Sequence, residues 1–151
     1  MILLPRERLW KEAWELLKVF LKEIRPLAPK CVLLFGSYAK KNFTESSDLD
    51  VCIIAEKLPQ EELARRCLRG SYSTSKIKAI GFFPEEFLQY LIGLRFLAFD
   101  IVHDGLLLYD DGFYAKIRDV YEQCIKKYTI IKEDVDWRWK LPSERESQKC
   151  S

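Results

Sequence analysis

The apolar positions of the chain fall into two kinds of run, and each kind predicts one kind of element. Helices are predicted, from apolar spacing or from proline and acidic residues at their starts, over residues 6–25, 37–42, 59–70, 84–94 and 112–128. Short, nearly continuous apolar runs predict strands over residues 31–35, 48–55, 76–82 and 96–103, and after a turn at Asp104–Gly105 over residues 106–109. The alternation predicts an α/β fold with helices flanking a mixed sheet of about four or five strands.

The chain changes character near its C-terminus. Residues 1–131 are predicted to form one domain, and residues 132–151 a polar tail whose end is mobile. Trp137 and Trp139 are unusual in such a charged segment. Two interpretations of them stay open: they fold back onto the domain, or they contact a partner.

Composition narrows the class of protein. The 151 residues are 48% hydrophobic and 32% charged, which is typical of a soluble globular protein. A net charge of +2 gives no strong nucleic-acid signal, and no apolar run is long enough for a membrane helix. The five cysteines are scattered without a C-x-x-C pair, which favours a reducing cytoplasm. Because the net charge is close to neutral, any phosphate chemistry must come from a local site.

One pair of aspartates lies at the start of a strongly apolar strand. Asp48 and Asp50 are two residues apart, so their side chains point from the same face of the predicted strand. Two carboxylates at a half-buried site repel each other by roughly 3–4 kcal/mol, which a bound cation would relieve. Hard oxygen ligands favour Mg²⁺. A second D-x-D, Asp134 and Asp136, lies in the polar C-terminal segment and is interpreted as solvated surface.

A glycine and a serine follow the strand predicted at residues 31–35. Gly36 allows the backbone to leave a buried strand tightly and to approach a ligand closely. The backbone N–H groups after it, together with the Ser37 hydroxyl, predict an anion cradle. A phosphate cradle beside a two-carboxylate metal site would hold a metal–triphosphate.

Gly36-Ser37, ten intervening residues and then Asp48-x-Asp50 resemble the signature of the minimal nucleotidyltransferases, the short branch of the DNA polymerase beta superfamily. The resemblance covers roughly residues 8–128. It implies a polymerase-beta-like nucleotidyltransferase fold and Mg²⁺-dependent transfer of AMP from ATP to a hydroxyl, with Gly36 and Ser37 near the phosphates. Lys40, in the same loop, is a further candidate for phosphate contact, although lysines in a loop are also typical of solvated surface. One departure is the pair Lys40-Lys41, where the family often has Arg and Gly.

The resemblance also implies a third carboxylate on a later strand, which arrives beside the first two. Asp100 and Asp104 are the candidates, and Asp100 is preferred because Asp104 precedes Gly105 in a predicted turn. Asp48, Asp50 and Asp100 would then hold two Mg²⁺ ions, one nearer the acceptor hydroxyl and one nearer the pyrophosphate. Asp100 would also be placed to accept the hydroxyl proton.

The acceptor follows less directly from the sequence. Proteins that the chain resembles commonly act as antitoxins that adenylylate a tyrosine of a helical HEPN-type toxin. Two alternatives stay open: transfer to a small molecule such as an aminoglycoside, and a vestigial nucleotide-binding module. A homo-oligomer is also possible from the sequence. The expected docking surface for a protein partner is the apolar helix around Phe87, Leu88, Leu91 and Ile92, with Trp137 and Trp139.

Overall fold

The computed structural model describes residues 4–68, 75–133 and 136–139. Within these ranges the chain forms, in order, α1 (Pro5–Glu23), a short 3-10 helix η1 (Arg25–Leu27), β1 (Pro29–Phe35), α2 (Ser37–Lys40), β2 (Leu49–Ala55), α3 (Glu62–Arg66), β3 (Ile77–Phe82), α4 (Pro84–Ile92), α5 (Phe96–Asp104), β4 (Leu106–Asp110), α6 (Phe113–Tyr128), β5 (Ile130–Glu133) and β6 (Asp136–Trp139).

Four strands form one mixed sheet in the order β3-β2-β1-β4. β1 pairs antiparallel with both β2 and β4, whereas β2 and β3 are parallel and are joined through α3. The α/β fold with a mixed sheet of four strands flanked by helices is confirmed. β5 and β6 form a separate antiparallel hairpin.

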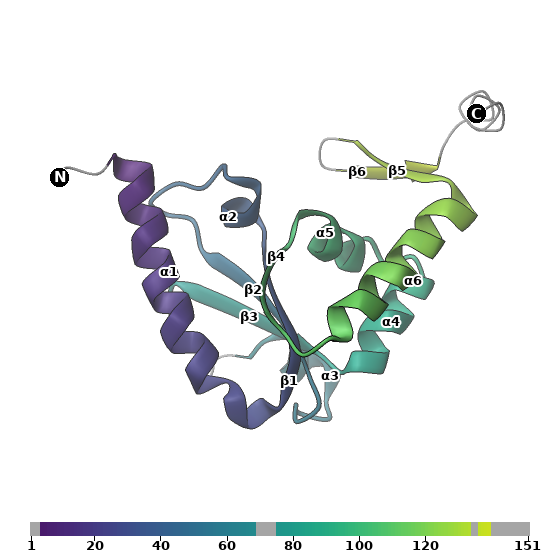
Figure 1. Cartoon of the computed structure of the whole chain (residues 1–151), viewed down its shortest axis with the longest axis horizontal. Coiled ribbons are helices and arrows are strands. Elements are labelled where there is room, and N and C mark those ends of the chain that lie inside the picture. The colour runs from purple at the N-terminus through teal and green to yellow at the C-terminus, as the bar shows by residue number, and fades with distance from the viewer. Residues whose placement is uncertain (1–3, 69–74, 134–135, 140–151) are drawn as a thin grey trace.

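The two faces of the sheet carry two hydrophobic cores. α1 packs on one face through Ala13, Leu17 and Phe20, while α4, α5 and α6 cover the other face (Figure 1). Alternate residues of each strand serve opposite cores, as the pleat requires. Val51 and Ile53 belong to the α1 face, and their neighbours Cys52 and Ile54 to the face covered by α4–α6. The sheet is therefore buried on both sides along most of its length.

The strand predicted over residues 96–103 is wrong, because these residues form helix α5. A short apolar run is compatible with either a buried strand or a buried helix, and only its length and spacing distinguish them. Ala98, Ile101 and Val102 are buried at helical spacing, whereas Leu97 is 44% exposed. The left-handed backbone of Leu94 allows the chain to turn from α4 into this helix.

The apolar helix that was expected to dock a partner is mostly internal. Of the four apolar residues of α4 named for this surface, Phe87, Leu88 and Leu91 are buried, and Ile92 is exposed, at 50%. α5 and α6 cover this helix, since three helices share one face of the sheet (Figure 1). The docking surface predicted there is therefore wrong as far as these three side chains are concerned.

The hairpin β5–β6 lies beside α5 and α6, and the predicted domain boundary after residue 131 falls within β5. Trp137 is 8% exposed and its ring packs against Phe96, Phe99 and Tyr121. Of the two interpretations of this residue, folding back onto the domain is the one observed. The side chain of Trp139 lies outside the described residues, as do Asp134 and residues 140–151.

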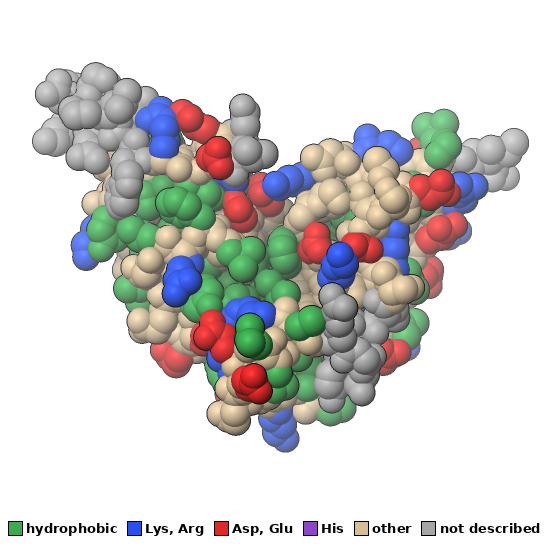
Figure 2. Space-filling view, turned by 180° about the vertical axis from the view of Figure 1, so that it is seen from behind, with side chains coloured by type: hydrophobic (Ala, Val, Ile, Leu, Met, Phe, Trp, Pro, Cys, Tyr) green, Lys and Arg blue, Asp and Glu red, His purple; other side chains and the backbone are tan. Residues whose placement is uncertain are grey.

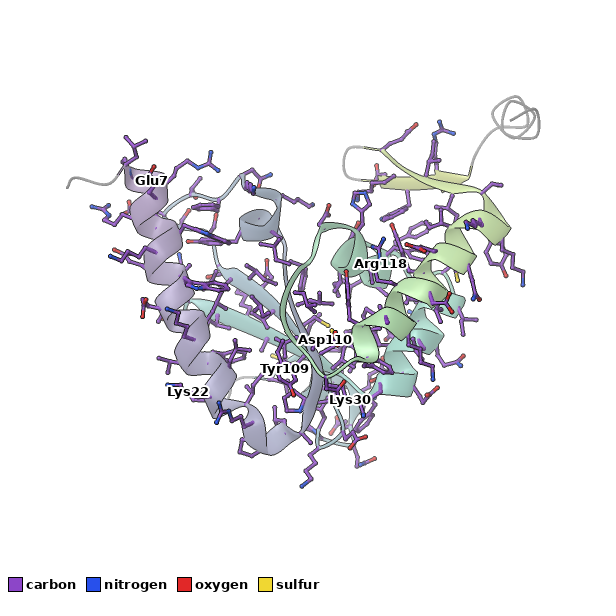
Figure 3. All side chains as sticks on the ribbon, viewed as in Figure 1. Glu7, Lys22, Lys30, Tyr109, Asp110 and Arg118 are labelled. Carbon is purple, nitrogen blue, oxygen red and sulfur yellow. The ribbon has the colours of Figure 1, made fainter. Side chains whose placement is uncertain are left out.

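The start of α6 is fixed by a side chain from β4. The Asp110 carboxylate accepts hydrogen bonds from the backbone N–H groups of Gly112 and Tyr114, at 2.9 and 3.0 Å (Figure 3). These groups have no partner inside the helix, so the contact stabilises its first turn. Among the described residues, no helix combines the length and the apolar character that crossing a bilayer would require.

Candidate functional site

Gly36 is the point at which β1 turns into α2. Its backbone has φ 75° and ψ −154°, a combination available to glycine and costly for other residues. A Cβ atom at this position would lie 2.3 Å from Oδ2 of Asp50. The predicted close approach at Gly36 is therefore observed, and the group that approaches it is the carboxylate of the second aspartate.

Asp48 directly precedes β2 and Asp50 is its second residue, so the strand begins one residue later than predicted. Asp50 is aligned with Phe35, the last residue of β1, so the carboxylates lie beside the Gly36 turn. Burial, and after it the negative charge of Asp48, raise the pKa of Asp50 above its ordinary value, while Lys78 opposes the shift. A nearby positive charge therefore stabilises the ionised forms of both carboxylates, and a divalent cation would supply that charge.

Lys78 is a site residue that the sequence reasoning missed. It lies on β3, directly beside Asp50 in the parallel register, and its Nζ lies 3.0 Å from Oδ2 of Asp48. The signal for Lys78 in the sequence is weak. The apolar pattern of residues 76–82 predicts a strand, but only the pairing of β3 with β2 in the structure shows which of its residues faces the aspartates.

The turn after Gly36 is held by aromatic packing. Tyr38, in α2, is fully buried and stacks on Phe43 with ring centroids 4.2 Å apart. Both rings also stack on Trp10 of α1, at 5.7 Å each. In the loop before β2, the Thr44 N–H donates to the Ser47 hydroxyl at 2.8 Å. Both segments that flank the proposed site are thus tied down by local contacts.

Lys40 ends α2 and faces the end of α5. Its Nζ lies 3.8 Å from Oδ2 of Asp104, whose other oxygen is 2.8 Å from Nδ1 of His103. The side chain of Asp104 is only 15% exposed. Ser37 begins α2, so Ser37 and Lys40 lie on the turn that follows Gly36, as predicted.

Asp100 is held away from the aspartate pair by other partners. It lies on α5, where one of its carboxylate oxygens accepts hydrogen bonds from Lys132 Nζ at 2.6 Å and from Trp137 Nε1 at 2.7 Å. Within residues 4–68, 75–133 and 136–139, no three His, Cys, Asp or Glu side chains are grouped closely enough to hold a metal. The structure therefore brings Asp48 and Asp50 together and does not bring Asp100 or Asp104 to them.

The molecule has two arms, with α1 on one side and α4–α6 with the β5–β6 hairpin on the other (Figure 1). The surface between these arms is hollowed, with apolar side chains in its floor and charged ones at its rims (Figure 2). A cavity of about 510 Å³ is lined by Ile80, Tyr90, Arg95 and Phe96, among others. Ile80 follows Lys78 by two residues on β3, so this wall of the cavity lies on the same face of the sheet as the aspartate pair. A second cavity, of about 620 Å³, is lined by Lys22 and Tyr109, among others (Figure 3). Its lining includes neither of the two aspartates and shares no residue with the first cavity.

The residues at β2 fit a divalent cation only in part. Two carboxylates on one face, one of them with a raised pKa, are hard oxygen donors that suit Mg²⁺. The neighbouring strand supplies an ammonium group at Lys78 rather than a further carboxylate. The donor set is therefore sufficient for one shared ion and lacks the third carboxylate that two ions would use.

Comparison with known proteins gives a family match and two structural likenesses. The nucleotidyltransferase domain family matches residues 15–136. No curated protein matches the sequence. A toxin–antitoxin crystallised with AMP-PNP is 18% identical with a TM-score of 0.46, covering 86% of this chain and 92% of that one. A toxin–antitoxin MntA–HpeT mutant is 16% identical with a TM-score of 0.46, covering 88% of this chain and 94% of that one.

Proposed function

The chain belongs to the nucleotidyltransferase domain family, and from this premise we propose that it transfers AMP from ATP to a hydroxyl acceptor in a Mg²⁺-dependent reaction. Asp48 and Asp50 bind the cation, and the Gly36–Ser37 turn binds the phosphates, with Lys40 at the end of the same turn. Each of these residues was a candidate on sequence grounds alone.

One observation carries the proposal: the Asp50 carboxylate lies against the Cα atom of Gly36. The phosphate-binding turn and the carboxylate pair are therefore parts of one site. A triphosphate on the Gly36–Ser37 turn would place its oxygens beside the carboxylates, where a shared cation satisfies both. Neither element alone would have this property, since a glycine turn and a D-x-D pair are each common in unrelated proteins.

The chemistry assigned to the chain's own groups is binding and orientation. The backbone after Gly36 and the Ser37 hydroxyl donate hydrogen bonds to phosphate oxygens. When bound, Mg²⁺ neutralises charge on the triphosphate and lowers the pKa of the acceptor hydroxyl. The acceptor oxygen forms a bond to the α-phosphorus, the bond to pyrophosphate breaks, and the hydroxyl proton passes to solvent. Asp48 and Asp50 fix the position at which this exchange occurs.

For the acceptor, we propose a tyrosine of a protein partner of the HEPN type. The resemblance of the Gly36-Ser37…Asp48-x-Asp50 signature to minimal nucleotidyltransferases supports this choice. With Phe87, Leu88 and Leu91 buried, the partner would dock elsewhere. The cavity lined by Ile80 and Tyr90 is the natural place, because Ile80 lies two residues after Lys78, which is paired with Asp50 in the register of β2 and β3.

Calorimetry with Mg²⁺ and a non-hydrolysable ATP analogue tests the site, and α-labelled ATP tests the transfer. Asp48→Ala and Asp50→Ala should each weaken analogue binding by at least about tenfold, since a tenfold change corresponds to about 1.4 kcal/mol and one lost carboxylate ligand exceeds that. Asp136→Ala is the matched control, because Asp136 is exposed and belongs to the second D-x-D of the chain.

Unchanged affinity in both site variants would refute the assignment. Binding without transfer of label to any protein, in a lysate of the host, would instead favour a vestigial nucleotide-binding module. Label on a small molecule alone would favour the small-molecule transferase.

A further inference from the structure

The strand beside the aspartate pair places a positive charge next to Asp48. Lys78 is paired with Asp50 in the parallel register of β2 and β3, so the two side chains leave the same face of the sheet. The Lys78 ammonium lies 3.0 Å from Asp48. The side chain of Asp48 is 32% exposed and that of Lys78 is 64% exposed, so the ion pair faces solvent.

Among residues 4–68, 75–133 and 136–139, no other carboxylate supplies the missing ligand. Asp100 is hydrogen-bonded to Lys132 and Trp137, and Asp104 lies between His103 and Lys40. In the described part of the chain, no third acidic side chain joins Asp48 and Asp50 as a metal-binding group. The site thus combines two negative side chains with one positive side chain.

A resident ammonium changes what such a site can hold. At about 5 Å in water, the repulsion between a divalent cation and an ammonium group weakens binding on the order of tenfold. This repulsion weakens the binding of every divalent cation at the site. A first ion, shared by two carboxylates and a triphosphate, has enough ligands to bind despite it. A second ion would have to share the same carboxylates while the ammonium stays beside them.

We propose that Lys78 takes the place of a third carboxylate ligand, so that the site holds one divalent cation with the nucleotide and the Lys78 ammonium supplies the second positive charge to the phosphates. This proposal rests on the proposed function. A lysine is suited to the role because its ammonium is a compact charge on a flexible stem and binds phosphate oxygens readily. Without nucleotide the ammonium stays on Asp48, and with nucleotide it moves the short distance to a phosphate oxygen.

The experiment counts bound ions directly. Mn²⁺ is titrated into the full-length chain with a saturating non-hydrolysable ATP analogue, and free Mn²⁺ is followed by electron paramagnetic resonance. The wild type should bind one Mn²⁺ per chain. Lys78→Asp, which adds a carboxylate and removes the ammonium, should bind two, the second at least about tenfold tighter than any second ion in the wild type.

Two further variants separate charge from ligation. Lys78→Met removes the ammonium and adds no ligand, so it should still bind one Mn²⁺ and should bind the analogue on the order of tenfold more weakly. Lys116→Asp makes the same change of charge on α6, where Lys116 is 60% exposed, and should behave as the wild type. Thermal unfolding of each variant shows whether it is folded. If Lys78→Asp does not fold, the number of Mn²⁺ ions bound by the wild type and the analogue affinity of Lys78→Met still test the proposal.

The outcomes distinguish the two proposals. Two Mn²⁺ ions in the wild type, or full analogue affinity in Lys78→Met, would overturn the role of Lys78 and leave the nucleotidyltransferase site intact. A wild type that binds neither the analogue nor Mn²⁺ would overturn the proposed function itself.

Discussion

Replacing Gly36 by alanine is the sharpest test of how the turn and the carboxylate pair depend on each other. The backbone at Gly36, with φ 75° and ψ −154°, costs any other residue about 1–3 kcal/mol. The new Cβ would also lie 2.3 Å from Oδ2 of Asp50, so the carboxylate must retreat by roughly 1 Å in a closely packed region. Together the two effects should lower the free energy of unfolding by about 2–4 kcal/mol, which is roughly 5–15 °C in Tm for a domain of this size.

The functional effect of Gly36→Ala should exceed the effect of strain alone. Because the added methyl group displaces Asp50, the affinity for the Mg²⁺–nucleotide complex should fall at least about tenfold. Gly112→Ala is the matched control: Gly112 has φ 113°, and a Cβ there meets nothing within 4 Å. It should lose about 1–2 kcal/mol of stability from backbone strain and keep full nucleotide affinity. Calorimetry and thermal unfolding measure both quantities, and wild-type affinity in Gly36→Ala would refute the argument.

Two further predictions concern charged groups outside the turn. Burial by itself would raise the pKa of Glu86, but hydrogen bonds from Arg65, Arg66 and a backbone N–H outweigh it and lower the pKa to about 2. Since this folded-state pKa is below the ordinary value, the stability that Glu86 contributes is complete above about pH 4.5 and is lost as the pH falls toward 2. Urea unfolding of Glu86→Gln should show a weaker pH dependence in that window than the wild type, and equal dependence would contradict the role of the two arginines. Asp100→Asn should lower the free energy of unfolding by about 1–3 kcal/mol, because Lys132 loses its charged partner. Its Mn²⁺ and nucleotide affinities should stay at the wild-type level, and a selective loss of metal binding would restore Asp100 to the site.

The parts of the site that local sequence determines were predictable. The turn at a glycine after a buried strand, and a pair of aspartates on one face of the next strand, can be predicted from a few neighbouring residues. The structure places Gly36, Asp48 and Asp50 together. The helices α1 and α6 were also predictable, because their apolar spacing is long enough to be unambiguous.

What failed were features that depend on contacts between distant segments. Residues 96–103 are too short and too uniformly apolar to show whether they form a strand or a helix, so the packing of α5 against α4 and α6 decides. The role of Lys78 depends on the register between β2 and β3, which no spacing within either strand specifies. Asp100 was placed in the site because of the erroneous strand, and the helix turns it toward Lys132 and Trp137 instead.

The stacked rings of Trp10, Tyr38 and Phe43 have a consequence for the thermodynamics of ligand binding. A binding loop that is mobile in the free protein must lose conformational entropy when a ligand arrives, and that loss is subtracted from the affinity. Here the turn after Gly36 is already fixed on α1 by ring contacts before any phosphate is present. The entropy was lost during folding, so the phosphate group that we propose for this turn would meet a preorganised receptor, and a weak set of hydrogen bonds would suffice for a useful affinity.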